Sequence, residues 1–262
     1  MADVVEGTFR NGEPYLRVGA GRPLVYLSGF NTEHANPRAF GRRLTLWTLR
    51  KFVDAGFVVY YTGRAPNLAP TTTFPDLAAS LADGIADHFA APADILGHST
   101  GGSLVLQTIA DRPEVVRKAV VASAAYQLGP VGRRAQAELV LGLEKDGRFP
   151  AHLLAEGFTR NHLLQRLIAT VLRPLALGRV DRPADPIVVL RAEDAFDVRD
   201  RLPDVLTQTM VIGGARDYFY TAELFAETAS LMPNGTLTLY PDRGHNIVIS
   251  ARFAADVIAF LG

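Results

Sequence analysis

Short apolar runs alternate along most of this chain with longer segments whose apolar residues recur at helical spacing. A short apolar run bounded by turn residues indicates a buried strand, and a longer amphipathic segment indicates a helix. We predict strands at residues 24–28, 57–61, 94–97, 118–122, 209–213 and 236–240, and helices at about 37–55, 74–89, 101–111, 222–232 and 247–261. Such alternation predicts an α/β fold, with a mostly parallel, doubly wound sheet covered by helices on both faces.

The first residues follow a different pattern. Residues 8–10 and 15–18 read as two strands, and Asn11-Gly12 lies between them. Asn-Gly favours the tight turns that join antiparallel strands. We therefore predict an N-terminal hairpin ahead of the parallel strands.

The alternation stops between about Tyr126 and Asp200. This stretch reads as helical throughout, at residues 132–145, 149–158, 161–177 and about 187–198. Residues 187–190 alone would also fit a strand, but the sequence that follows favours a helix. We predict a core made of residues 1–125 and 200–262, with residues 126–199 inserted as a helical lid. Its apolar residues are expected to pack the lid onto the core or to line a pocket, and they include Leu153, Leu154, Phe158, Leu163, Leu164 and Leu167.

Composition narrows the classes of partner. The chain has 262 residues, 48% of them hydrophobic, and its formal net charge is zero. A balanced charge without basic runs argues against nucleic acid and membrane partners, and no apolar run approaches the ~18 residues of a membrane span. The chain begins without the pattern of a secretory signal and holds no cysteine, so thiolate chemistry is excluded. We expect a cytoplasmic protein that acts on a small molecule.

The sequence Gly97-His98-Ser99-Thr100-Gly101 lies between a predicted strand and a predicted helix. A serine on so sharp a turn requires a strained backbone, and side chains two residues before and after it would collide. The pattern is typical of the nucleophile elbow of serine hydrolases. It predicts that the Ser99 hydroxyl stands clear of the sheet at the start of a helix.

A serine nucleophile needs a base to take its proton and an acid to orient that base. His245 follows the strand predicted at 236–240, and Asp217 follows the strand predicted at 209–213. Parallel strands place such residues at one edge of the sheet. The chain order Ser, Asp, His is the one that α/β-hydrolases use.

Other aspartate and histidine residues are candidates for the same roles. Asp194, Asp197 and Asp200 would serve as the acid if the insertion were shorter, whereas Asp242 is expected to cap or pair within its loop. His98 is expected to pack inside the turn. His34 is either a substrate contact or a solvent-exposed loop residue. His88, His152 and His162 have no partner pattern and are taken as structural.

These motifs resemble those of the α/β-hydrolase fold family across nearly the whole chain. Leu27-Ser28-Gly29-Phe30 resembles the family's oxyanion loop, with Ser28 where many members have histidine. The resemblance implies that the backbone N–H groups of Phe30 and Thr100 form an oxyanion hole. Residues 193–202 resemble the segment that leads many members out of the lid, whereas residues 61–64 depart from the usual Asp-X-Arg-Gly.

The combined pattern predicts a serine hydrolase that cleaves a small, mainly apolar carboxylic ester or related acyl compound through an acyl-enzyme. No metal and no organic cofactor are implied. The same triad on this fold serves lactonases, thioesterases, C–C hydrolases and haloperoxidase-like enzymes, which remain alternatives. A ligand-binding receptor with weak or no turnover is the alternative from another class.

Overall fold

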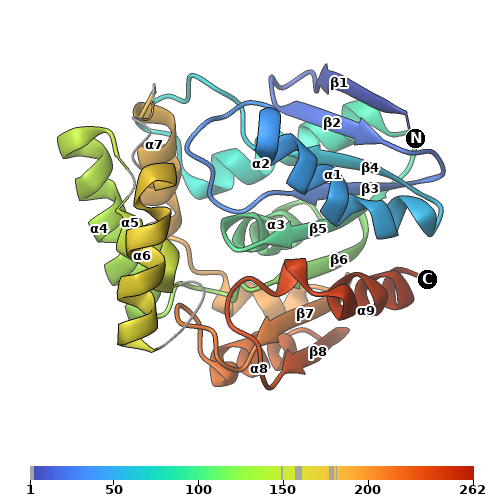
Figure 1. The fold of residues 1–262 in the computed structure, drawn as a ribbon. Coiled ribbons are helices and arrows are strands. Elements are labelled where there is room, and N and C mark those ends of the chain that lie inside the picture. Colours follow the sequence, from blue (N-terminus) through green and yellow to red (C-terminus); the bar gives the residue numbers. More distant parts are fainter. Residues whose placement is uncertain (1–2, 149, 157–160, 177–179, 181) are drawn as a thin grey trace.

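The computed structural model describes residues 3–148, 150–156, 161–176, 180 and 182–262. In this part of the chain eight strands form one sheet in the order β1-β2-β4-β3-β5-β6-β7-β8. The hairpin strands β1 and β2 pair antiparallel with the sheet, and the other strands run parallel (Figure 1). The strands are β1 Val4–Thr8, β2 Pro14–Val18, β3 Arg22–Leu27, β4 Phe57–Thr62, β5 Ala93–His98, β6 Val116–Ala122, β7 Gln208–Gly214 and β8 Gly235–Tyr240.

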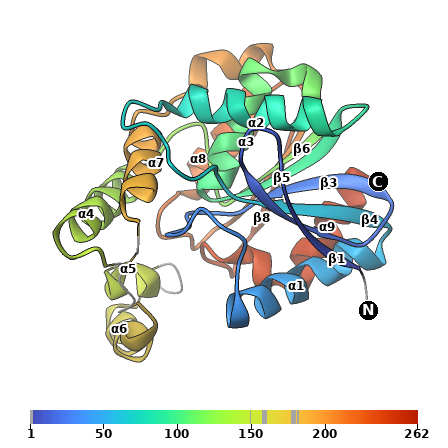
Figure 2. The same ribbon diagram turned by 90° about the horizontal axis from the view of Figure 1, so that it is seen from above.

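Helices cover both faces of the sheet, as the alternating pattern predicts (Figure 2). One apolar cluster buries residues of α2 (Phe74–His88), α3 (Thr100–Asp111) and α8 (Ala222–Leu231). A second cluster on the opposite face buries residues of α1 (Ala39–Asp54) and α9 (Ala251–Leu261). The sheet therefore lies between two apolar layers, and only its edges and ends reach solvent.

The N-terminal hairpin is present, but its turn is longer than predicted. Strand β1 ends at Thr8, so the prediction of a strand through Arg10 is wrong there. The Phe9 N–H donates to the Glu13 carbonyl at 2.9 Å, and Gly12 takes a positive φ of 89°. Phe9 leaves the strand because its ring is buried against Val58 and Tyr60. The packing of one aromatic ring thus overrides the short turn that Asn-Gly favours.

The predicted C-terminal helix is also interrupted. Residues Ile247–Ile249 form a short 3₁₀ turn, and α9 begins only at Ala251. The Ser250 hydroxyl accepts a hydrogen bond from the Arg252 N–H, which caps the new helix. Serine is a preferred N-cap residue, because its hydroxyl accepts a hydrogen bond from an N–H group of the first helical turn. This cap at Ser250 accounts for the separation of the 3₁₀ turn from α9.

The chain between β6 and β7 contains four helices, which lie together at one end of the sheet (Figure 1). They are α4 Pro130–Asp146, α5 Ala151–Glu156, α6 His162–Ala176 and α7 Ala184–Asp194. The helix predicted at 187–198 begins earlier and ends at Asp194, because Asp197 instead forms a β-bridge with Gln127. Parts of the segments predicted at 149–158 and 161–177, including Phe158, lie outside the described residues.

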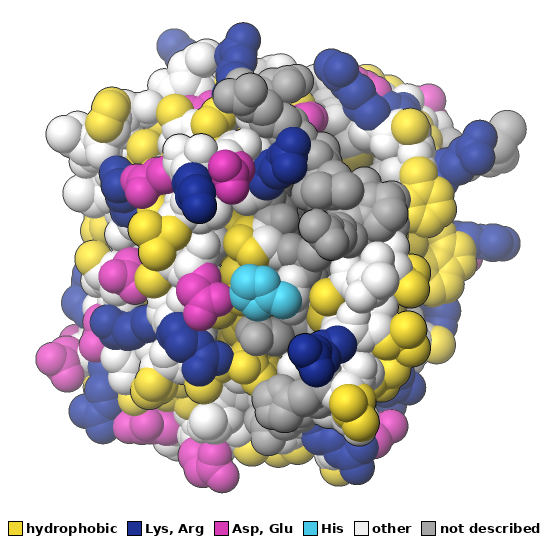
Figure 3. Space-filling view, turned by 60° about the vertical axis from the view of Figure 1, so that its left-hand side comes forward, with side chains coloured by type: hydrophobic (Ala, Val, Ile, Leu, Met, Phe, Trp, Pro, Cys, Tyr) yellow, Lys and Arg dark blue, Asp and Glu magenta, His cyan; other side chains and the backbone are white. Residues whose placement is uncertain are grey.

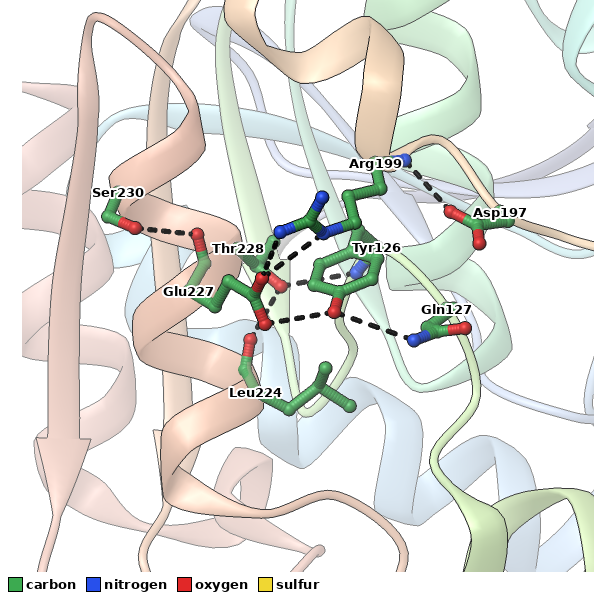
Figure 4. A network of polar contacts seen from close by, with 8 residues as sticks. All are labelled: Tyr126, Gln127, Asp197, Arg199, Leu224, Glu227, Thr228 and Ser230. Atoms are coloured by element: carbon green, nitrogen blue, oxygen red, sulfur yellow. Dashed lines mark hydrogen bonds and ion pairs between the residues drawn. The ribbon is translucent and has the colours of Figure 1, made fainter.

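The two ends of this helical segment meet on α8 (Figure 4). Glu227 accepts a hydrogen bond from the Tyr126 hydroxyl at 2.9 Å and ion-pairs with Arg199 at 2.8 Å. The Val198 N–H donates to the Tyr126 carbonyl at 3.1 Å. Tyr126 and Arg199 thus both contact Glu227 of the same helix, and a backbone hydrogen bond between Val198 and Tyr126 brings the two ends of the segment together.

The surface on this side of the molecule carries both signs of charge. Acidic and basic side chains lie interspersed with hydrophobic ones (Figure 3). Within the described parts of the chain, every helix is too short or too polar to cross a membrane.

Candidate functional site

Ser99 occupies the sharp turn between β5 and α3. Its backbone has φ 55° and ψ −126°, a strained conformation for a residue with a side chain. The Ser99 N–H donates to the Ala122 carbonyl of the neighbouring strand at 2.8 Å, which fixes the turn to the sheet. The predicted strained elbow is therefore present in the backbone.

Both glycines of the motif are required by close backbone contact. A Cβ atom built on Gly97 would lie 2.1 Å from the carbonyl oxygen of Gly101. No real Cβ tolerates such a distance, and the atom it would strike belongs to the backbone. This is the collision that the sequence motif predicts before Ser99, whereas a Cβ atom on Gly101 would meet the carbonyl oxygen of Ser28, in the loop after β3, at 2.5 Å.

His245 and Asp217 lie beside Ser99 in a continuous chain of polar contacts. The Ser99 Oγ is 3.0 Å from His245 Nε2, and His245 Nδ1 is 2.9 Å from Asp217 Oδ2. A carboxylate only accepts hydrogen bonds, so Nδ1 carries the proton and Nε2 is left to accept from the serine hydroxyl. The three loops that follow β5, β7 and β8 thus bring together the residues that the sequence selects.

Asp217 is fully buried and held from two directions. Its Oδ1 accepts hydrogen bonds from the N–H groups of Phe219 at 2.8 Å and Tyr220 at 3.3 Å. These bonds leave Oδ2 directed at His245. A carboxylate whose two oxygens are both occupied has one orientation, which is what a residue that orients an imidazole requires.

The His245 ring is also packed between aromatic side chains. The Tyr220 ring stacks nearly parallel to it at 6.1 Å, and the Phe219 ring meets it edge-on at 4.9 Å. The hydroxyl of Ser123 donates to the His245 carbonyl at 2.7 Å. Ser123 follows β6 with a positive φ of 51°, and its contribution was not predicted from the sequence.

The alternative acids lie elsewhere. Asp194, Asp197 and Asp200 are exposed, and Asp197 accepts a hydrogen bond from the backbone N–H of Arg199. Asp242 is 3.6 Å from the neighbouring Arg243. The structure therefore places Asp217, and not one of these residues, against His245.

His98 packs inside the turn, as expected. Its ring lies 5.4 Å from the His245 ring, and its Nε2 is 3.4 Å from the His245 carbonyl oxygen. Burial, and to a smaller extent the nearby His245, lower the pKa of His98 to about 3. His98 is therefore neutral at ordinary pH and does not compete as a base.

His34 lies on the loop after β3 but away from Ser99. Its Nδ1 is 2.8 Å from the Ala65 carbonyl oxygen, and burial lowers its pKa. The cavity that contains Ser99 is lined by other residues of this loop, Gly29, Phe30 and Asn31. A substrate contact by His34 remains a prediction.

A cavity of about 450 Å³ opens above Ser99. Phe30 and Thr100, whose backbone N–H groups are the predicted oxyanion donors, lie in its wall beside Ser99 and His245. The helical segment contributes the apolar residues of the opposite wall, which are Leu128, Ala135, Leu139, Leu153 and Leu190. The cavity therefore lies between the core and the segment 126–199.

The apolar residues predicted for this segment divide between two environments. Leu153 is buried and lines the cavity. Leu163, Leu164 and Leu167 on α6 are exposed, so they do not pack against the core. Neither Phe158 nor the side chain of Leu154 belongs to the described part of the chain.

Glu193 is a cavity residue that the sequence analysis missed. It lies at the end of α7, is buried, and faces the cavity from the side of the helical segment. Burial raises its pKa, against the opposing effect of the Ser103 and Thr100 hydroxyls and of Arg64. Helical spacing would have placed Glu193 on the same face as the apolar Val189 and Leu190, and this is the signal that could have identified it.

Arg64 was also missed. It is buried just after β4, and it donates hydrogen bonds to the carbonyl oxygens of Ser28 at 3.0 Å and Gly29 at 2.6 Å. Burial lowers its pKa, whereas the carboxyls of Glu193 and Glu13 and the Tyr61 hydroxyl raise it. The sequence shows only a basic residue just after a predicted strand. It does not indicate which carbonyl groups this residue binds.

The site offers no cluster of metal ligands. Within the residues that the structure describes, His, Asp and Glu side chains nowhere gather in a group of three or more that could hold a metal ion.

Comparisons with known proteins agree with the fold of this chain. The family model described as "Alpha/beta hydrolase family" matches residues 24–258. BpoC from Mycobacterium tuberculosis H37Rv, named as a non-heme bromoperoxidase, has a similar structure, with a TM-score of 0.76, 20% identity and 95% of each chain covered. An esterase from Exiguobacterium antarcticum matches with a TM-score of 0.73, 17% identity and coverage of 100% of this chain and 99% of that one. An enol-lactonase from Burkholderia xenovorans LB400 matches with a TM-score of 0.72, 18% identity and coverage of 98% and 99%.

Proposed function

Since this chain belongs to the alpha/beta hydrolase family, we propose that it is a serine hydrolase that cleaves small, mainly apolar carboxylic esters or related acyl compounds. The observation that carries the proposal is the continuous contact from Ser99 Oγ through His245 to Asp217, at 3.0 and 2.9 Å. A buried carboxylate, an oriented imidazole and a strained serine in this order are the parts that acyl transfer needs.

In the proposed reaction, Ser99 Oγ attacks the carbonyl carbon of the substrate while His245 Nε2 takes its proton. The same proton passes from His245 to the leaving alcohol as the carbon–oxygen bond breaks, which leaves an acyl-enzyme on Ser99. Water then gives a proton to His245 and attacks the acyl carbon, and the acid and the free serine are formed. Asp217 stabilises the imidazolium in both halves.

The charge that develops on the carbonyl oxygen needs hydrogen-bond donors. The N–H groups of Phe30 and Thr100 are the proposed donors, and both residues lie in the cavity wall beside Ser99. Thr100 is the first residue of α3, and the N–H groups of a first helical turn have no partner within the helix. The N-terminal end of this helix also favours negative charge.

The cavity supports the proposed substrate class. Its volume of about 450 Å³ suits a small ligand, and apolar side chains from the segment 126–199 form one wall. Burial of apolar groups contributes about 0.8 kcal/mol per CH₂, so an aliphatic or ring acyl group gains with each added carbon until the cavity is full. In this proposal the segment acts as a lid over the reacting carbonyl.

A fluorophosphonate probe tests the proposal directly. It should label the protein at one serine, and the Ser99→Ala variant should not be labelled, whereas Ser230→Ala, a change at an exposed serine, should label normally. Hydrolysis of p-nitrophenyl esters and lactones should fall by several orders of magnitude in Ser99→Ala. Binding of these compounds without turnover by the unmodified protein would instead support the receptor alternative.

A further inference from the structure

Arg64 is a buried cation whose hydrogen bonds go to backbone carbonyl groups of the loop after β3. It is 3% exposed, and its Nη1 donates to both the Ser28 and the Gly29 carbonyl oxygens. Burial of a guanidinium is costly unless its surroundings compensate it. Here two carbonyl dipoles do so, together with the nearby carboxyl groups of Glu13 and Glu193.

The Gly29 carbonyl and the Phe30 N–H belong to the same peptide group. The peptide bonds among the described residues are all trans, and in a planar trans peptide the C=O and N–H bonds point in opposite directions. Arg64 therefore fixes more than the carbonyl that it binds. By holding the Gly29 oxygen at 2.6 Å, it directs the Phe30 N–H to the opposite side of the loop.

This peptide group is packed against the turn of Ser99. A Cβ atom built on Gly29 would lie 3.4 Å from the Ser99 Cβ and 3.3 Å from the His98 carbonyl oxygen. Gly29 and Phe30 both line the cavity above Ser99. If this peptide rotated by half a turn, it would present a carbonyl oxygen where a donor is needed, and an oxyanion there would be repelled.

We propose that Arg64 is a positioning residue that holds the Phe30 amide in place as an oxyanion donor by binding the Gly29 carbonyl. The inference rests on the proposed serine-hydrolase function and extends it to a residue that does not touch the substrate. Hydrogen bonds to a charged donor are shorter and stronger than neutral ones, and they polarise the peptide that accepts them. The guanidinium thus strengthens the Phe30 N–H as a donor as well as orienting it.

Two phosphoryl compounds that differ in one atom separate this role from a structural one. Paraoxon and its thio analogue parathion both transfer their phosphoryl group to a serine. The serine oxygen bonds to phosphorus, the bond to p-nitrophenolate breaks, and the serine proton passes to the histidine. Charge gathers on the P=O oxygen of paraoxon, whereas the sulfur of parathion is a weaker acceptor. The ratio of the two rates therefore reports on the oxyanion donors.

The variants are Arg64→Met, Arg64→Lys and, as a control, Arg117→Met. Arg117 also donates to a backbone carbonyl, that of Leu261, but it lies at the start of β6 and outside the cavity lining. We expect Arg64→Met to slow the paraoxon reaction by about 10²–10³, the loss typical of one oxyanion donor. The parathion reaction should slow less, so the ratio falls. Arg64→Lys should restore part of the paraoxon-to-parathion ratio, and Arg117→Met should leave this ratio unchanged.

Ester hydrolysis supplies a second readout. An oxyanion donor acts mainly in the transition state, so kcat of Arg64→Met should fall while KM changes little. If Arg64→Met does not fold, the folded Arg64→Lys variant decides the question through the same ratio. An unchanged paraoxon-to-parathion ratio in a folded Arg64 variant overturns the positioning role. If the unmodified protein does not react with paraoxon at Ser99, the proposed function itself fails.

Discussion

Gly101 lies directly against the carbonyl oxygen of Ser28. A Cβ atom built on Gly101 would be 2.5 Å from this oxygen and 2.6 Å from that of Leu27. The turn that carries Ser99 and the loop that carries Phe30 therefore meet backbone to backbone at Gly101. The relative position of the proposed nucleophile and the proposed oxyanion donor depends on this contact, which only glycine allows.

The Gly101→Ala variant should lose both stability and activity. The added methyl group must push two backbone segments apart, and overpacking of this kind costs about 1–3 kcal/mol. Gly41→Ala is the control, because Gly41 lies exposed on α1 and its new Cβ would meet only Pro37, at 3.8 Å. That change should stabilise the protein by up to about 1 kcal/mol. Urea unfolding and esterase rates measure both effects, and equal behaviour of the two variants would contradict the argument.

Asp217→Asn should leave the fold intact and lower kcat by about 10⁴, because an amide favours the wrong tautomer of the imidazole. Asp194→Asn, at an exposed position, is the control and should have a mild effect. Steady-state hydrolysis of p-nitrophenyl esters compares the two. A severe loss in Asp194→Asn with normal turnover in Asp217→Asn would show that the acid has been misassigned.

Acyl-chain preference should follow the volume of the cavity. Across p-nitrophenyl esters from acetate to decanoate, kcat/KM should rise over the first added methylenes and fall once the cavity is full. Leu139→Trp should move the optimum to shorter chains, because Leu139 lines the cavity from α4. Leu141→Trp should not, because Leu141 is 64% exposed on the same helix. A flat profile, or a best rate on decanoate, would favour an open groove.

Glu13 should make the protein less stable as the pH rises. Burial raises its pKa from 4.5 to about 7, although the Asn11 hydrogen bond and Arg64 act in the opposite direction. Between these values the folded protein keeps a proton that the unfolded chain has released, so the free energy of unfolding falls across this range. Glu13→Gln removes the titration. The stability of this variant relative to the unmodified protein should therefore grow from about pH 4.5 to 7 and then level off. A difference that is constant from pH 4 to pH 8 would refute the assignment.

Local sequence determined the order of elements and the chemistry of the elbow. The periods of apolar residues predicted the parallel strands and their helices, because each element must bury one face or stripe. The elbow was readable in part because the requirement at Gly97 is local: a Cβ there would meet the backbone of Gly101 within the same turn, whereas at Gly101 it would meet Ser28 and Leu27, far away in sequence. His245 and Asp217 could be selected because parallel strands end at one edge of the sheet.

The tertiary structure alone decided the features that depend on contacts between distant segments. Phe9 left its predicted strand because its ring found a cluster with Val58 and Tyr60. Arg64 meets the Gly29 carbonyl only because β3 and β4 are neighbours in the sheet. Glu193 lines the cavity only because the fold places the end of α7 beside Ser99 and His245. Residue type and the local period of apolar residues determine which helices and strands form and which polar side chains they carry. A hydrogen bond or a packing contact between segments far apart in sequence depends on the fold that brings the segments together.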